Sequence, residues 1–291
     1  MHESSVEFLR CVRCGSRLEL EVFTHDLEIE EGVFECQKCK LTFPIIEKIP
    51  ILWDDFSGYL SSRKILGGKL YRLSNTGKMK NFLKYSLSKT KKTDEDRTIL
   101  EEKWSKIYQN SKNSKFYYLI KKNLDSIPKS KLVLEYGCSI GIVTSSMSDN
   151  HDIVFGIDRS FSALRYAKKS SKNNLDYVVA NSISPVFGKL QFDLILALNV
   201  LELIEPLELL KHVSGQISTG YFVISDPYDF DRGTNSVKKP INETKLRTNL
   251  EQLGFKISSK TKKPSFMPWN LKLNSRATLN YKVDLIIGKK K

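Results

Sequence analysis

Short apolar runs alternate with helical segments from residue 131 to residue 257, and most of the runs end at a polar residue. The runs cover residues 132–134, 153–157, 177–180, 192–198, 221–224 and 255–257, and residues 279–287 add a seventh with alternating polarity. Apolar runs of this length, bounded by turns, indicate buried strands. Strands that alternate with helices indicate a parallel sheet, with ligands bound beyond the carboxyl ends of the strands. We therefore expect an α/β fold with a doubly wound, seven-stranded, mostly parallel sheet.

The turn after the first of these strands contains Glu135, Gly137 and Gly141. Glycines at such a turn allow the backbone to approach a ligand closely, and the following helix offers free N–H groups. An ordinary packing turn is the alternative. A dinucleotide fingerprint requires a second glycine two residues after the first. Ser139 occupies that place, so the sequence disfavours a dehydrogenase.

Two C-x-x-C pairs near the start of the chain predict a metal site. The pairs are formed by Cys11, Cys14, Cys36 and Cys39. Two such pairs complete a tetrahedral four-thiolate site, which suits structural Zn²⁺ because no coordination position stays open. Iron is the minor alternative because it uses the same ligands. A segment this short buries too little surface to fold unaided, so we expect the metal to stabilise a small β zinc ribbon.

Charge and composition divide the chain into three expected parts. Residues 1–55 form the zinc ribbon, residues 56–93 a basic connector, and residues 94–291 the main domain. Apolar patches in the connector mean that it could form short helices and not a free linker. The connector has ten Lys or Arg residues and no acid, and the whole chain has a net charge of +14. Clustered bases permit RNA binding, although surplus lysines on solvated loops explain the charge equally well. No apolar run reaches the ~20 residues that span a bilayer, so we expect a cytoplasmic protein without a membrane partner.

Two stretches resemble known families. Residues 8–52, with their cysteine pairs followed by Phe43-Pro-Ile and Ile49-Pro-Ile-Leu, resemble a small zinc-ribbon family whose members activate methyltransferases. Residues 131–226, with Glu135, Gly137 and Gly141 at the first turn, resemble class I S-adenosylmethionine (SAM)-dependent methyltransferases. The resemblance implies SAM as cofactor and methyl transfer as activity.

The same resemblance implies a cofactor role for eight residues at the strand ends. Gly137, Cys138 and Gly141 would approach the methionine moiety, and Glu135 would act near its ammonium group. Asp158 would accept both ribose hydroxyls, which suits a carboxylate. Asn181 and Ser182 would lie near the adenine, and Asn199 matches the segment after the fourth strand. Taken singly, Asp158 could instead cap a helix and Asn181 could instead make a turn.

The acidic, aromatic loop at residues 226–231 would face the methyl acceptor. Within it, Asp226 or Tyr228 could orient or deprotonate the acceptor, and a plain surface turn is the alternative. The sequence does not specify whether the acceptor is RNA, protein or a small molecule. A different class of function is a non-catalytic module that binds nucleic acid through the ribbon and two basic segments, residues 56–93 and 256–291.

Overall fold

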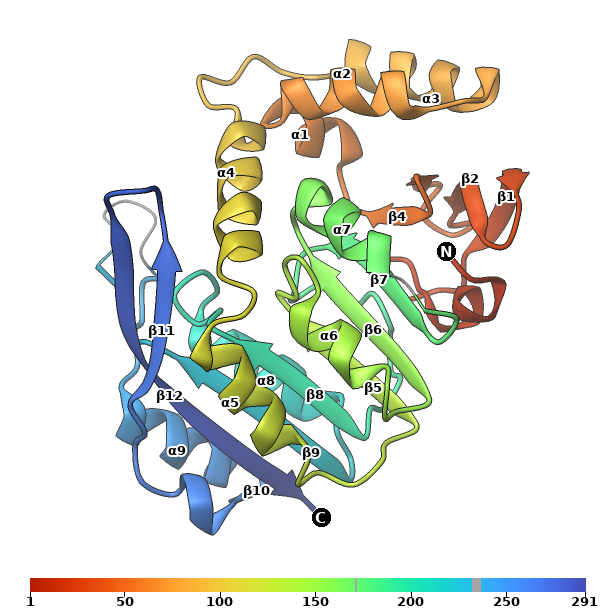
Figure 1. Cartoon of the computed structure of the whole chain (residues 1–291). Helices are drawn as coiled ribbons and strands as arrows, with labels where there is room; N and C mark the ends of the chain where they lie inside the picture. Colours follow the sequence, from red (N-terminus) through yellow and green to blue (C-terminus); the bar gives the residue numbers. More distant parts are fainter. Residues whose placement is uncertain (171, 232–236) are drawn as a thin grey trace. The chain divides into compact units, whose positions relative to one another are not determined.

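The computed structural model describes residues 1–170, 172–231 and 237–291, and it divides into two compact units (Figure 1). Unit 1 comprises Met1–Lys106, Ser139–Gly141 and Ile157–Leu190, and unit 2 comprises Ile107–Cys138, Ile142–Gly156 and Gln191–Lys291. The units do not coincide with the three parts expected from the sequence, whose boundaries stay a prediction. In the part of the chain that the structure describes, no helix is both long and apolar enough to cross a membrane.

The strands of unit 1 join the zinc ribbon to the main sheet. In order they are β1 (Glu19–His25), β2 (Ile29–Glu35), β3 (Thr42–Ile46), β4 (Ile49–Leu52) and β7 (Leu175–Ala180). The first four pair antiparallel, as expected for a ribbon. β4 also pairs parallel with β7, with Ile51 opposite Val179 and Leu52 opposite Ala180. The ribbon is therefore continuous with the sheet through β4.

The segment expected as a basic connector is helical. It contains α1 (Phe56–Ser61), α2 (Lys64–Leu73) and α3 (Gly77–Ser88). Helix α1 begins where an Asp55 carboxylate oxygen accepts the Gly58 N–H at 2.8 Å, and α3 begins where the Thr76 hydroxyl accepts the Met79 N–H at 3.1 Å. Each bond satisfies a backbone donor that a helix leaves free at its start. The other helices of unit 1 are η1 (Glu3–Phe8), α7 (Phe161–Ala167) and η2 (Lys168–Ser170).

Unit 2 contains a mixed sheet. Its strands are β5 (Leu132–Tyr136), β8 (Leu194–Leu198), β9 (Gly220–Asp226), β12 (Thr278–Lys290), β10 (Phe255–Ile257) and β11 (Met267–Lys272). β5, β8 and β9 pair parallel. β12 runs antiparallel to β9, β10 and β11. Every residue of β5 is buried, because helical crossovers cover both faces of parallel strands.

The helices of unit 2 follow the expected alternation with strands. They are α5 (Lys115–Leu124), α6 (Ile142–Met147), α8 (Pro206–Gly215), α9 (Glu243–Gln252) and η4 (Ser259–Thr261). Gly254 has a φ of +89° two residues after α9, which is the left-handed conformation of a helix C-terminal cap. Helix α4 (Arg97–Asn110) and strand β6 (Ile153–Asp158) each have residues in both units.

Candidate functional site

The four predicted metal ligands lie together in unit 1. The sulfur atoms of Cys11, Cys14, Cys36 and Cys39 lie within 4.8 Å of one another, and in the described part of the chain the cluster holds no histidine or carboxylate. Both C-x-x-C turns have the same backbone, in which the N–H after the second cysteine donates to the carbonyl of the first. These bonds are Gly15 N to Cys11 O at 2.8 Å and Lys40 N to Cys36 O at 2.7 Å. Four converging thiols fit structural Zn²⁺.

A second group of potential ligands, His2, Glu28 and Asp176, is an ion-pair network. The Lys168 ammonium lies among them, in contact with Glu28 and 2.8 Å from an Asp176 oxygen. Burial alone would raise the pKa of Glu28, but Lys168 and the neighbouring charges lower it to about 2. A lysine at the centre of these acids disfavours a cation there, so the network joins the ribbon to β7 and does not form a metal site.

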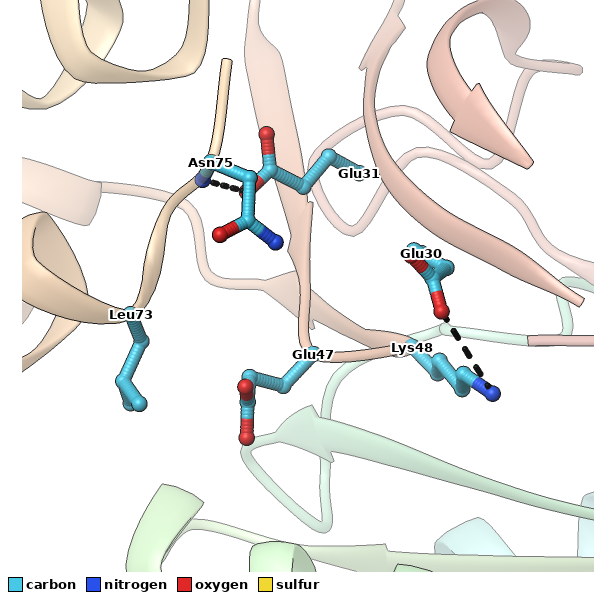
Figure 2. Close-up of a pocket in the computed structure, with 6 residues that line it drawn as sticks. All are labelled: Glu30, Glu31, Glu47, Lys48, Leu73 and Asn75. Atoms are coloured by element: carbon cyan, nitrogen blue, oxygen red, sulfur yellow. Dashed lines mark hydrogen bonds and ion pairs between the residues drawn. The ribbon is translucent and has the colours of Figure 1, made fainter. Parts of the chain in front are cut away.

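A cavity of about 190 Å³ lies beside the turn between β3 and β4 (Figure 2). Its lining includes Glu30, Glu31, Glu47 and Lys48. The buried Glu31 carboxylate accepts the N–H groups of Asn75 and Thr76 and the Thr76 hydroxyl, and Lys48 lies 3.7 Å from Glu30. These bonds fix the start of α3 against the ribbon, which gives the acids a structural role.

The glycine turn after β5 requires glycine at both predicted positions. Gly137 has a φ of +66°, and a Cβ there would lie 2.4 Å from the Val200 side chain. Gly141 has a φ of +71°, and a Cβ there would lie 2.4 Å from the Tyr177 hydroxyl oxygen. L-residues rarely adopt this backbone conformation. Gly137 is thus closely packed against Val200 of unit 2, and Gly141 against Tyr177 of unit 1.

Asp158, at the end of β6, is bonded to this turn within unit 1. One carboxylate oxygen accepts the Ser139 N–H at 2.9 Å, and the other accepts the Ser160 N–H at 2.8 Å. Burial raises the pKa of Asp158, and the two N–H groups oppose that rise. Each oxygen keeps a second lone pair, so the carboxylate can accept a further hydrogen bond on both sides. Ser139, identified in the sequence only as the residue that breaks a dinucleotide fingerprint, is the residue that positions Asp158.

Asn181 and Ser182, which follow β7 in unit 1, differ in exposure. Asn181 is exposed, and its side-chain oxygen accepts the Ile183 N–H at 3.3 Å. Ser182 is buried. The turn-forming contact agrees with the alternative interpretation of Asn181, while its amide nitrogen remains a donor.

In unit 2, Glu135, Cys138 and Asn199 are buried. Glu135 accepts a hydrogen bond from the Thr144 hydroxyl of α6. Asn199 has a φ of +55°, and its side-chain oxygen accepts the Ser225 hydroxyl at 2.9 Å. These contacts fix the residues that follow β5 and β8. Glu135 and Asn199 are therefore each held by a hydrogen bond from a neighbouring hydroxyl group.

The two candidate catalytic residues are part of a buried polar network in unit 2. Asp226 accepts the Leu201 and Tyr228 N–H groups at 3.0 and 2.8 Å. The Tyr228 hydroxyl donates to Asp284 at 2.9 Å, and burial together with that carboxylate raises the pKa of Tyr228. Arg247 forms two hydrogen bonds with Asp284, at 2.7 and 3.0 Å. Sequence reasoning missed Arg247 and Asp284; the only signal for Asp284 was that it is the sole acid of its strand.

Two family models match the sequence. The model described as a methyltransferase domain matches residues 111–260, which is more than half of the chain. The model described as Trm112p-like protein matches residues 6–47, which contain the four clustered cysteines. No curated protein matches the sequence.

Solved structures with a similar fold include two relevant examples. Magnesium protoporphyrin IX methyltransferase from Synechocystis PCC 6803, with bound SAH, is 15% identical and has a TM-score of 0.50; the match covers 67% of this chain and 96% of that chain. A chain from the Haloferax volcanii complex of the Trm112 methyltransferase activator is 12% identical and has a TM-score of 0.51; the match covers 65% of this chain and 96% of that chain. These likenesses confirm the predicted α/β fold.

Proposed function

Because this chain belongs to the methyltransferase domain family, we propose that Asp158 and the glycine turn at residues 137–141 bind SAM. The chain is a SAM-dependent methyltransferase with its own Trm112p-like zinc ribbon. The observation that carries the assignment of residues is the bonding of Asp158. Its two oxygens are held by separate N–H groups, and each can accept a ribose hydroxyl.

The other predicted cofactor residues have proposed roles that follow from their chemistry. Gly137 and Gly141 give the turn a left-handed backbone that can pass close to the methionine moiety, and Cys138 lies in the same turn. Glu135 is held by Thr144 and supplies negative charge for the ammonium group. The residues after β7 and β8 serve the adenine end, with Asn181 and Ser182 as hydrogen-bonding groups and Asn199 as a fixed neighbour.

Held by Asp158 and the glycine turn, the cofactor would supply an activated methyl group for in-line transfer to an acceptor atom, with its sulfur as the leaving group. The protein's part is then to hold the acceptor in line and exclude water. Both oxygens of Asp226 accept backbone N–H groups, and Tyr228 donates to Asp284. We therefore assign both residues to positioning the acceptor loop, and the acceptor proton leaves to solvent or to a basic group of the acceptor.

Calorimetric titration with SAM tests the cofactor assignment. Two hydrogen bonds to a charged acceptor are worth about 1.5–3 kcal/mol each, so Asp158→Ala should weaken SAM binding at least on the order of 100-fold. Asp94→Ala removes an exposed carboxylate from the same unit and should bind SAM like the wild type. Absence of SAM binding by the folded wild type would refute the proposal.

The pH profile of kcat tests the positioning role of Tyr228. Tyr228→Phe removes the hydroxyl that donates to Asp284 while keeping the ring. If the hydroxyl only positions the loop, the variant lowers kcat without changing the pH profile of kcat. A lost basic limb in that profile would instead identify Tyr228 as an acid or base.

A further inference from the structure

We propose that the helical pair α2 and α3 binds the phosphate backbone of a single-stranded nucleic acid, which makes nucleic acid the acceptor class of this methyltransferase. The proposal rests on the proposed function for its link to methyl transfer. The binding surface is formed by Lys64, Gly68 and Arg72 on α2 and by Lys84 on α3, and we refer to it as the basic hairpin.

The charge of this segment is mostly uncompensated. Residues 56–93 contain ten Lys or Arg residues and no acid. Three of the ten pair with acids elsewhere in unit 1: Arg63 with Glu101, Lys69 with Glu102, and Lys78 with Glu21. Within the described residues, no ion pair joins an acid to the remaining seven, which are Lys64, Arg72, Lys80, Lys84, Lys89, Lys91 and Lys92. The Lys64 ammonium donates to the uncharged Thr93 carbonyl at 3.0 Å. A solvated face of this kind attracts polyanions.

The packing of the two helices turns three of these bases, Lys64, Arg72 and Lys84, outward on one surface together with Gly68. Leu66, Gly67 and Leu70 of α2 are buried, whereas Lys64, Gly68 and Arg72 are exposed. Residues four apart lie above one another on a helix, so the last three form a single stripe. The Lys84 ammonium of α3 lies 5.8 Å from the centre of the Tyr71 ring of α2. That contact places Lys84 beside the stripe.

Gly68 lies in the middle of this stripe and has no packing function. A Cβ at the adjacent Gly67 would lie 2.6 Å from the Leu87 side chain, so Gly67 is needed where α2 meets α3. A Cβ at Gly68 would meet nothing within 4 Å. Glycine in a helix interior is destabilising relative to alanine. A gap in the side chains between two bases allows a phosphate group to reach the helix surface, which gives Gly68 a function in binding.

Lysine–tyrosine pairs favour a nucleic acid over other polyanions. Besides the Lys84–Tyr71 pair, the Lys89 ammonium lies 3.9 Å from the centre of the Tyr85 ring, and Tyr85 is 62% exposed. Bases of a single strand stack on exposed aromatic rings while cations contact its backbone. A purely electrostatic surface for anionic lipid or an acidic protein does not require these rings.

The basic hairpin is anchored next to Asp158 within unit 1. The buried Tyr59 hydroxyl of α1 donates to the carbonyl of Arg159 at 3.0 Å. The Arg63 guanidinium, at the start of α2, lies 4.2 Å from the centre of the Tyr59 ring and pairs with Glu101 at 2.7 Å. A strand bound to α2 would therefore be held close to the residue that we propose contacts the cofactor ribose.

Fluorescence anisotropy with labelled single-stranded RNA and DNA of one sequence tests the proposal. The variant Lys64→Gln/Arg72→Gln/Lys84→Gln should weaken binding on the order of tenfold or more. Each lost phosphate contact lowers the steepness of the plot of log K against log salt by about 0.7, so the slope should become shallower by about 2. The matched control Lys260→Gln/Lys262→Gln/Lys263→Gln removes the same charge from an exposed part of unit 2. It should bind like the wild type.

Gly68→Gln separates binding from folding. Glutamine is a good helix former, so the variant should melt no lower than the wild type yet bind severalfold more weakly. Gly215→Gln, at another helical glycine whose Cβ would meet nothing within 4 Å, should leave binding unchanged. Equal weakening by both triple variants, unchanged binding by the hairpin triple variant, or absence of binding to either strand at low salt would overturn the proposal. Binding to anionic vesicles without binding to RNA or DNA would overturn it as well.

SAM titration of the same variants keeps the two proposals distinguishable. The hairpin triple variant should bind SAM normally, and Asp158→Ala should bind nucleic acid normally. Nucleic acid binding without any SAM binding by the wild type would refute the cofactor proposal alone. SAM binding without nucleic acid binding would refute only the role of the basic hairpin.

Discussion

The zinc ribbon and the sheet of unit 2 reach stability by different means. In β1 no side chain is fully buried, whereas all five residues of β5 are. The ribbon buries most side chains of β2, β3 and β4, but it also depends on metal binding by four thiols that lie within 4.8 Å of one another. Unit 2 distributes its stability over buried strands and one buried ion pair, Arg247–Asp284. Loss of a single ligand should therefore abolish the structure of the ribbon, while the sheet should lose stability in proportion to each change.

Removal of a zinc ligand should have the largest effect. Structural Zn²⁺ contributes about 10–16 kcal/mol to the folding of small zinc domains, so Cys36→Ser should unfold the ribbon and lower the zinc content of the purified protein. Native mass spectrometry and limited proteolysis measure both changes. Cys138→Ser replaces a buried cysteine outside the cluster and should retain zinc. A full zinc content in Cys36→Ser would contradict the four-cysteine site.

Breaking the buried ion pair of unit 2 should have the second-largest effect on stability. Asp284→Ala leaves the Arg247 guanidinium buried without its carboxylate, which costs about 3–5 kcal/mol. Urea denaturation gives the change in the free energy of unfolding. Asp125→Ala, at an exposed position in the same unit, should stay within about 0.5 kcal/mol of the wild type. If Asp284→Ala lowers the free energy of unfolding by less than about 1 kcal/mol, the Arg247–Asp284 network contributes little to stability.

A histidine of α8 should make unit 2 sensitive to acid. Burial lowers the pKa of His212, and its Nε2 atom has no hydrogen-bond partner among the described residues. At low pH the unfolded state therefore binds a proton that the folded state resists. The contribution of His212 to the free energy of unfolding is constant above the unfolded pKa of about 6.5. As the pH falls below that value, the free energy of unfolding decreases by up to about 1.4 kcal/mol per pH unit. His212→Leu should reduce this slope in denaturation curves measured between pH 7 and pH 5. An unchanged slope in His212→Leu would contradict the burial effect.

The smallest expected effect on stability comes from the residue that follows the second cysteine in each C-x-x-C turn. The residue after the second cysteine is left-handed in both, as Gly15 with a φ of +69° and as Lys40 with a φ of +54°. A left-handed L-residue costs about 1–2 kcal/mol, partly offset because glycine loses more entropy on folding. Lys40→Gly should therefore raise the stability of the metal-loaded ribbon by about 1 kcal/mol or less. Gly15→Ala, whose Cβ would meet nothing within 4 Å, should lower it by a similar amount. Chelator-resistance assays compare the two, and a destabilising Lys40→Gly would refute the backbone argument.

The strands and helices that repeat along the sequence were predictable because their patterns are local. The alternation between residues 131 and 257 predicted β5 to β10, and the cysteine spacing predicted the four-thiol cluster, which the structure confirms. Helices α1 to α3 were less predictable, since lysines interrupt the apolar positions that pack them. The cofactor roles of Asp158 and the glycine turn stay predictions, with contacts that agree with them.

Contacts between distant segments could not be predicted from local patterns. The pairing of β4 with β7 joins segments far apart in the chain, and nothing in the run Ile49–Leu52 specifies its partner. Ser139 and Tyr228 adopt left-handed backbone conformations that their residue types do not indicate. Asp284 has the sequence pattern of an ordinary polar position in an alternating strand. Its role depends on Arg247, which the fold brings within 2.7 Å.

The pairing of β4 with β7 also affects how the protein can be handled. All six side chains of β7 are buried, and β4 covers the backbone along one side of this strand. A truncated protein that begins after β4 would expose an apolar strand edge, and exposed edges of this kind promote aggregation. Expression of the methyltransferase region without its ribbon should therefore yield insoluble material.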